Sequence, residues 1–109
     1  MHELSIAQDV VETVCERAGG RRVRSVRMVV GALCAVVPDS MYFCFELAAT
    51  GTAAEGARLD LETPDGVGHC RECGADFTLT DPILLCPCGS ADVEVCSGRE
   101  LTIVSMEVS

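Results

Sequence analysis

Eight cysteines in 109 residues carry the strongest chemical signal in this sequence. Four of them lie in two short motifs, C-x-x-C-G at Cys70–Gly74 and C-P-C-G-S at Cys86–Ser90. Two residues between Cys70 and Cys73 let both sulfurs reach one metal ion, and the glycine that follows permits the left-handed turn of a zinc knuckle. With Cys86 and Cys88, the four thiolates predict a closed tetrahedral zinc site. Such a site is structural, because it leaves no open position for water or substrate.

Other uses of these residues follow from the same spacing. Two disulfides are the main alternative to a metal site, and the redox compartment decides between them. The N-terminus has no basic segment leading into an apolar run, so we expect no secretory signal and a cytoplasmic protein with reduced thiols. C-P-C is shorter than the usual C-x-x-C, and Cys96 or His69 would complete the zinc site if Cys86 and Cys88 could not both reach the ion.

The remaining cysteines give no ligand pattern. Cys15 and Cys44 fall within apolar stripes at helical spacing, so they are interpreted as small buried hydrophobic residues. Cys34 has no partner that its spacing identifies.

His2 is the second residue type whose position suggests chemistry. Methionine aminopeptidases prefer small second residues, so Met1 is expected to remain and His2 to stay at position two. The terminal amine, the nearby backbone amides and the imidazole together supply nitrogen donors in one plane. Square-planar nitrogen donation suits Ni(II) or Cu(II) and does not suit zinc.

Composition excludes several classes of function. Seventeen acidic residues against eight basic ones give a net charge of −9, and every basic residue is arginine. This balance opposes binding to nucleic-acid phosphates or to an anionic membrane surface. No apolar run approaches the roughly 20 residues of a membrane helix. The sequence has no nucleophile paired with a base and no phosphate-binding loop, so we expect a protein that is not an enzyme.

Hydrophobic periodicity predicts the elements that position these residues. Apolar residues recur at helical spacing from Leu4 to Ala18, with Ser5 and Gln8 as a capping box. The stretch Val23–Val30 alternates as a strand. Three further elements are predicted: a helix that opens at Pro38-Asp39-Ser40, where Asp39 or Ser40 is the cap, and ends before Gly51; a strand at Ala57–Thr63; and a strand at Leu101–Val108.

The order of these elements predicts an α+β fold with two parts. Residues 1–64 and 99–109 form a small mixed domain in which two helices pack on a three-stranded sheet. Residues 65–98 contain five cysteines and one aromatic residue, so this segment cannot build a core without a metal. We therefore expect a zinc ribbon inserted into the first domain.

The whole chain resembles the HypA/HybF family of nickel metallochaperones for [NiFe]-hydrogenase maturation. The resemblance rests on motifs in the family's order: Met1-His2-Glu3, the strand into Gly31, Phe43-Cys44-Phe45-Glu46, both cysteine motifs, and Gly98-Arg99-Glu100-Leu101. One departure is the second cysteine pair, which reads C-P-x-C in the family and C-P-C here.

This resemblance implies a function and a ligand set. It implies that His2 binds Ni(II), helped by backbone nitrogens, by Glu3 and by Asp39 near the start of the second helix. It implies structural zinc at the four cysteines. It also implies delivery of nickel, with a HypB-type GTPase, to the hydrogenase large subunit, and in some members to urease. A monomer and a homodimer are both compatible with the sequence.

Two other interpretations use the cysteines alone. A zinc-ribbon adaptor for protein interactions needs no nickel, and a small redox protein would hold iron at the same four sulfurs. Residues 66–98 carry one arginine and five acidic residues, which disfavours a nucleic-acid-binding ribbon. The metal carrier is the function that the sequence favours.

Overall fold

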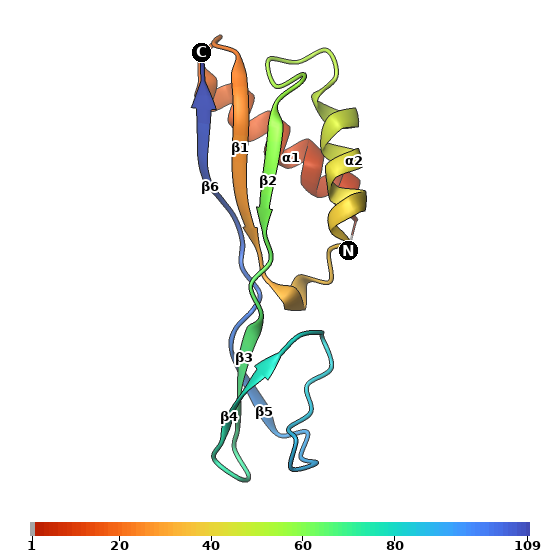
Figure 1. Cartoon of the computed structure of the whole chain (residues 1–109), viewed down its shortest axis with the longest axis vertical. Helices are drawn as coiled ribbons and strands as arrows, with labels where there is room; N and C mark the ends of the chain where they lie inside the picture. The colour runs from red at the N-terminus through yellow and green to blue at the C-terminus, as the bar shows by residue number, and fades with distance from the viewer. Residues whose placement is uncertain (1) are drawn as a thin grey trace. The chain divides into compact units, whose positions relative to one another are not determined.

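The computed structural model describes residues 2–109, which form two α-helices, one 3-10 helix and six strands (Figure 1). The elements are α1 (Glu3–Ala18), β1 (Val23–Val30), η1 (Ala32–Cys34), α2 (Pro38–Ala49), β2 (Arg58–Glu62), β3 (Gly66–Cys70), β4 (Asp76–Leu79), β5 (Val93–Ser97) and β6 (Leu101–Val108). The type and order of the predicted helices and strands are therefore confirmed. None of the helices in this part of the chain is long and apolar enough to cross a membrane.

The chain divides into two compact units. One unit contains the chain up to Met28 together with Val36–Glu62 and Thr102–Ser109. The other contains Val29–Ala35 and Thr63–Leu101. Residues 29–35, which are expected in the first domain, lie in the second unit. That the units are separate nickel-binding and zinc-binding domains stays a prediction.

The first sheet contains three strands in the order β2-β1-β6, as the sequence predicts. In β1, Val26, Met28 and Val30 are at most 2% exposed, which confirms the predicted alternation. β6 lies beside β1 although most of the chain separates them, and it runs opposite to β2 (Figure 1). The C-terminal strand therefore completes the sheet that the N-terminal half begins.

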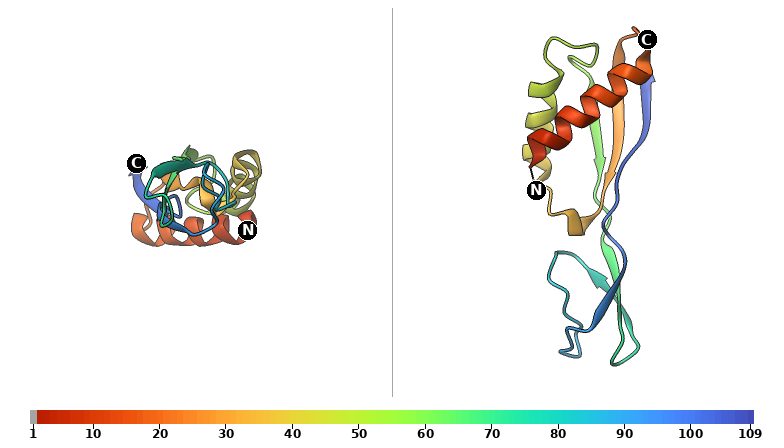
Figure 2. Two further views of the ribbon diagram at one scale, coloured as in Figure 1. Left: turned by 90° about the horizontal axis from the view of Figure 1, so that it is seen from below. Right: turned by 180° about the vertical axis from the view of Figure 1, so that it is seen from behind.

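Both helices bury one apolar stripe. α1 crosses the sheet, as Figure 2 shows from behind, and α2 contacts both α1 and β2. The buried residues of α1 are Ala7, Val10, Val11, Val14 and Ala18, and those of α2 are Met41, Phe45 and Ala49. This packing of two helices and a three-stranded sheet confirms the α+β fold class.

Both predicted helix caps are wrong. α1 begins at Glu3, and its N-cap is His2, so Ser5 lies inside the helix rather than at its boundary. α2 begins at Pro38, whose missing N–H suits the first helical position, and Val37 is the N-cap. Neither N-cap residue makes a side-chain capping hydrogen bond. The predicted burial of Cys15 and Cys44 is also wrong, because both are only half-buried.

The second unit contains a three-stranded antiparallel sheet in the order β4-β3-β5. Its core is small: Cys70, Cys86 and Val93 are buried, and Phe77 and Leu84 pack against them. Only one of these three residues has a hydrocarbon side chain, and Leu79 on β4 is buried in addition. A core of this size does not stabilise a fold by apolar burial alone, which agrees with the expected need for a metal.

Three chain segments meet by backbone contacts at one end of the second unit. Gly31 N–H donates to the Glu100 carbonyl at 2.7 Å, and Leu33 N–H donates to the Gly98 carbonyl at 2.9 Å. Gly98 has φ +117°, and a Cβ there would lie 2.7 Å from the Cα of Gly66. Glycine is required at this position both for its backbone conformation and for the close approach.

Candidate metal centres

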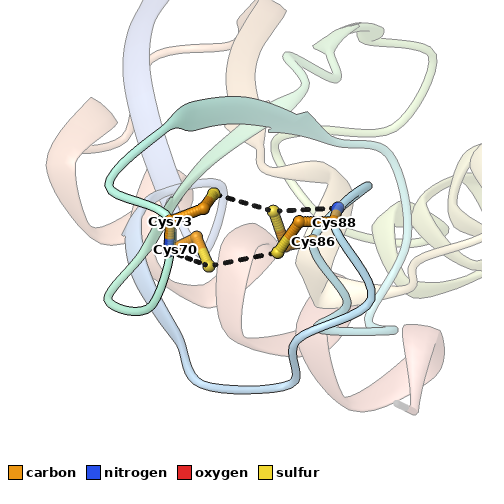
Figure 3. Close-up of side chains that lie close together, drawn as sticks. All are labelled: Cys70, Cys73, Cys86 and Cys88. Atoms are coloured by element: carbon orange, nitrogen blue, oxygen red, sulfur yellow. Dashed lines mark hydrogen bonds between the residues drawn. The ribbon is translucent and has the colours of Figure 1, made fainter.

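The four cysteines of the two motifs form one cluster. Their sulfurs all lie within 4.8 Å of one another, and this is the only group of three or more His, Cys, Asp or Glu ligand atoms so placed among residues 2–109. Cys70 and Cys86 are buried, whereas Cys73 and Cys88 are exposed. Figure 3 shows the two pairs on separate loops with their sulfurs turned toward one another. The structure thus brings together the four residues predicted from the motifs.

The spacing of the sulfurs fits tetrahedral zinc better than it fits two disulfides. The sulfurs of Cys70 and Cys88 are 3.7 Å apart, and those of Cys73 and Cys86 are also 3.7 Å apart. Zinc–sulfur bonds of about 2.3 Å give a tetrahedral sulfur–sulfur edge of about 3.8 Å. A disulfide requires about 2.0 Å. The donor set is four thiolates with no open position, so the group that fits is a structural zinc ion.

The shortened C-P-C motif forms the same knuckle as C-x-x-C with one residue fewer. In the first knuckle the Cys70 carbonyl accepts from Gly74 N–H at 2.8 Å, and Cys70 N–H donates to the Ala75 carbonyl at 2.9 Å. In the second knuckle the Cys86 carbonyl accepts from Gly89 N–H at 2.8 Å, and Cys86 N–H donates to the Ser90 carbonyl at 2.9 Å. Each bond of the second knuckle spans one residue fewer than its counterpart in the first, so the shorter loop closes with the same bonding pattern.

Each knuckle also directs one backbone N–H at the sulfur of its first cysteine. Cys73 N–H donates to the Cys70 sulfur, and Cys88 N–H donates to the Cys86 sulfur, each at 3.4 Å. The turn glycines Gly74 and Gly89 have φ +77° and +96°. Gly74 therefore has the left-handed conformation predicted for the first knuckle, and Gly89 has the same conformation in the second knuckle.

When no metal is bound, the surroundings of the sulfurs lower the pKa of Cys70 and raise the pKa of Cys86. The N–H of Cys73 is the main cause that lowers the pKa of Cys70 to about 6. The N–H of Cys88 also lowers the pKa of Cys86, but burial and the three neighbouring thiols together raise it to about 12. Zinc binding therefore displaces protons from the cluster, and zinc affinity falls in acid.

His69 and Cys96 lie outside this cluster. His69 Nδ1 lies 2.6 Å from Asp76 Oδ1. Cys96 is exposed, and its sulfur lies 4.0 Å from the Glu94 carbonyl oxygen. Neither is needed as a substitute ligand, since the short C-P-C knuckle presents both of its sulfurs.

The predicted nickel ligands lie at the starts of the two helices. His2 is exposed and occupies the N-cap position of α1, Glu3 is in the first turn of α1, and Asp39 is in the first turn of α2. Val37 N–H donates to Glu3 Oε2 at 3.3 Å, so Glu3 links the two helix starts. The N–H groups of Glu3 and Val37 lower the pKa of the Glu3 carboxyl. Met1, whose amine is part of the predicted nickel site, lies outside the described residues.

Comparison with known proteins decides the family. Residues 1–108 match the family described as hydrogenase/urease nickel incorporation, metallochaperone, hypA. The chain belongs to the HypA family. It is 47% identical over 109 residues to the hydrogenase maturation factor HypA of Geotalea uraniireducens, covering 99% of both chains. It is 42% identical over 108 residues to that of a Nostoc species, covering 99% of this chain and 96% of the relative.

Solved structures show the same fold at low sequence identity. The solution structure of the Ni metallochaperone HypA from Helicobacter pylori matches with a TM-score of 0.66 at 21% identity. The match covers 99% of this chain and 97% of that chain. Nickel transport is the role of the HypA family, and the relatives are named as maturation factors and metallochaperones rather than as enzymes.

Proposed function

We propose that this protein is a nickel metallochaperone that binds Ni(II) at its N-terminus and delivers it during maturation of [NiFe]-hydrogenase. The observation that carries the proposal is the family match over residues 1–108. In this proposal the four-cysteine site holds zinc permanently and supports the fold. The protein catalyses no reaction of its own and acts in the cytoplasm, where thiols stay reduced.

The start of α1 supplies suitable nitrogen donors for nickel. The first intrahelical hydrogen bond runs from Ile6 N–H to the His2 carbonyl at 3.2 Å. The N–H groups of His2 and Glu3 precede this bond, so they have no backbone acceptor within the helix. Deprotonated amide nitrogens at these positions coordinate Ni(II) without loss of a backbone hydrogen bond of the helix, and the bond lost is that from Glu3 N–H to its own carboxylate. The His2 imidazole, which is exposed, adds a further donor in the square-planar arrangement.

Two carboxylates supply negative charge for a nickel ion at the starts of the two helices. Helix N-termini carry a partial positive charge that opposes a bound cation. Glu3 and Asp39, each in the first turn of a helix, offset that charge. In our proposal His2 is the principal ligand, whereas Glu3 and Asp39 contribute oxygen ligands or charge.

Nickel is handed on because the site is open. One side chain at an exposed chain end leaves the ion accessible to a partner, unlike four thiolates that enclose it. The proposed partners are a HypB-type GTPase and the hydrogenase large subunit, with urease maturation as a second destination. The support for these partners is the family's role in hydrogenase and urease nickel incorporation.

Calorimetric titration of zinc-loaded, untagged protein with Ni(II) tests the proposal. We expect one high-affinity nickel ion per chain in the wild type, and loss of this event in His2→Ala with zinc retained. His69→Gln is the matched control, since His69 is the other histidine of the chain and the high-affinity event is expected to remain. An unchanged titration of His2→Ala contradicts the proposal and leaves a zinc-ribbon adaptor as the better function.

A further inference from the structure

The outer face of the β4-β3-β5 sheet places three potential ligands in a row. His69 lies on the central strand β3, directly opposite Asp76 on β4 and directly opposite Glu94 on β5. Residues directly opposite each other in antiparallel strands project from the same face, with about 5 Å between their Cβ atoms. The next residue of β3, Cys70, projects from the other face with Val93. The row is therefore on the sheet face opposite to the buried Cys70.

Asp76 holds the imidazole of His69 in one orientation. The 2.6 Å separation between Asp76 Oδ1 and His69 Nδ1 is a short hydrogen bond, in which Nδ1 carries the proton. In the neutral imidazole Nε2 is then the nitrogen with the free lone pair. A carboxylate bound to one ring nitrogen is the arrangement that orients metal-binding histidines and raises their basicity. The His69 side chain is 38% exposed, so an ion in solution can reach it.

Glu94 supplies a carboxylate on the other side of His69. Arg71 pairs with Asp92, whose Oδ1 lies 2.9 Å from Arg71 Nη1. The hydrogen bond to Asp92 raises the pKa of Arg71, and the charges of Asp92 and Glu94 raise it further, so Arg71 offsets only part of the negative charge on this face. Glu94 is exposed and directly opposite His69, so its flexible side chain has the reach to share a metal ion with the imidazole.

We propose that this face is a second, open site for a divalent transition-metal ion. His69 Nε2 and the Glu94 carboxylate bind the ion, Asp76 positions the imidazole, and water completes the coordination. Imidazole with carboxylate suits Ni(II), Cu(II) and Zn(II). With two protein ligands and free solvent access, the site binds its ion more weakly and releases it faster than four thiolates. The proposal does not depend on nickel binding at the N-terminus.

Zinc-loaded His2→Ala protein gives a direct test, because His69 is then the only histidine of the chain. Ni(II) is added in steps, and the His69 ring signals are followed by proton NMR. Since Ni(II) is paramagnetic, we expect these signals to broaden before other side-chain signals do. In this background Asp76→Asn is expected to weaken binding about tenfold or more, the usual effect of losing such a carboxylate partner. Glu94→Gln is expected to weaken it several-fold.

Asp81→Asn is the control, because it removes an exposed carboxylate of the same unit that does not lie opposite His69. It is expected to leave the titration unchanged. Zinc content, measured by elemental analysis, verifies that each variant keeps the four-cysteine site. The proposal is overturned if the His69 signals do not respond selectively, or if Asp76→Asn binds Ni(II) as tightly as its parent.

Discussion

The four-cysteine cluster and the start of α1 offer a metal ion opposite conditions. The four sulfurs are already within 4.8 Å of one another, and two knuckles with internal hydrogen bonds hold them. His2 contributes a single exposed side chain, which makes no capping hydrogen bond to α1. Preorganised ligands favour retention of an ion, whereas ligands that assemble around the ion favour exchange. In our proposal, one chain thus combines a site suited to permanent binding with a place suited to transfer.

The largest expected effect comes from breaking the closed site. Cys70→Ser removes a buried sulfur ligand, and we expect loss of zinc and unfolding of the second unit. Metal binding supplies on the order of 10 kcal/mol of folding free energy in small zinc domains. Zinc content and circular dichroism measure the result. Cys96→Ser is the matched control, because Cys96 is exposed and outside the cluster, and zinc retention is expected. Zinc loss in Cys96→Ser would contradict the assigned ligand set.

The next largest loss of stability is expected at the junction in the second unit, where Gly98 passes close to Gly66. Gly98→Ala places a Cβ 2.7 Å from the Cα of Gly66 and forces a residue with a side chain into φ +117°. We expect a loss of more than about 2 kcal/mol in the free energy of unfolding, measured by urea denaturation.

A second glycine separates the two causes of this loss. Gly20→Ala is also at positive φ, +88°, but no atom lies within 4 Å of its Cβ. It is expected to cost about 1 kcal/mol, from backbone conformation alone. Equal losses in Gly98→Ala and Gly20→Ala would show that the close approach at the junction is unimportant.

Insertion of one alanine between Pro87 and Cys88 tests whether the two knuckles are equivalent. The first knuckle makes the same hydrogen bonds with one residue more, so the lengthened loop has a geometry available to it. We expect zinc to be retained, with an affinity within about tenfold of the wild type in a chelator competition. Complete loss of zinc would mean that the cluster depends on the short C-P-C loop.

The smallest expected effect concerns Glu3. Its carboxyl pKa is lower in the folded protein, first through its own N–H and then through that of Val37. A lowered pKa stabilises the fold at pH values above the pKa of the unfolded chain, and this contribution is lost as pH falls through the folded pKa. Glu3→Gln is therefore expected to be less stable than the wild type at pH 7. Urea denaturation at pH 3 should show little difference, and an equal difference at both pH values would contradict this cause.

Sequence reasoning succeeded where the determining interactions are local. The cysteine motifs specify their own turns, and the apolar residues of α1 recur at one helical spacing, so both were predicted. The bond from Val37 to Glu3 joins residues 34 positions apart and leaves no signature in either segment. The membership of residues 29–35 in the second unit is determined by backbone bonds, such as that from Gly31 to Glu100. Backbone bonds of this kind are independent of side-chain type, so the sequence did not reveal them.

The backbone junction has a consequence for the order in which the chain folds. Between β2 and β6, residues 63–100 form an excursion that must close before the first sheet is complete. Ala32 N–H binds the Pro64 carbonyl where the chain enters this excursion, and Leu33 N–H binds the Gly98 carbonyl where it leaves. Closing a loop costs entropy that grows with its length. Zinc bound between Cys70 and Cys88 shortens the free loop, so metal loading should accelerate the final pairing of β6 and thereby the folding of the sheet.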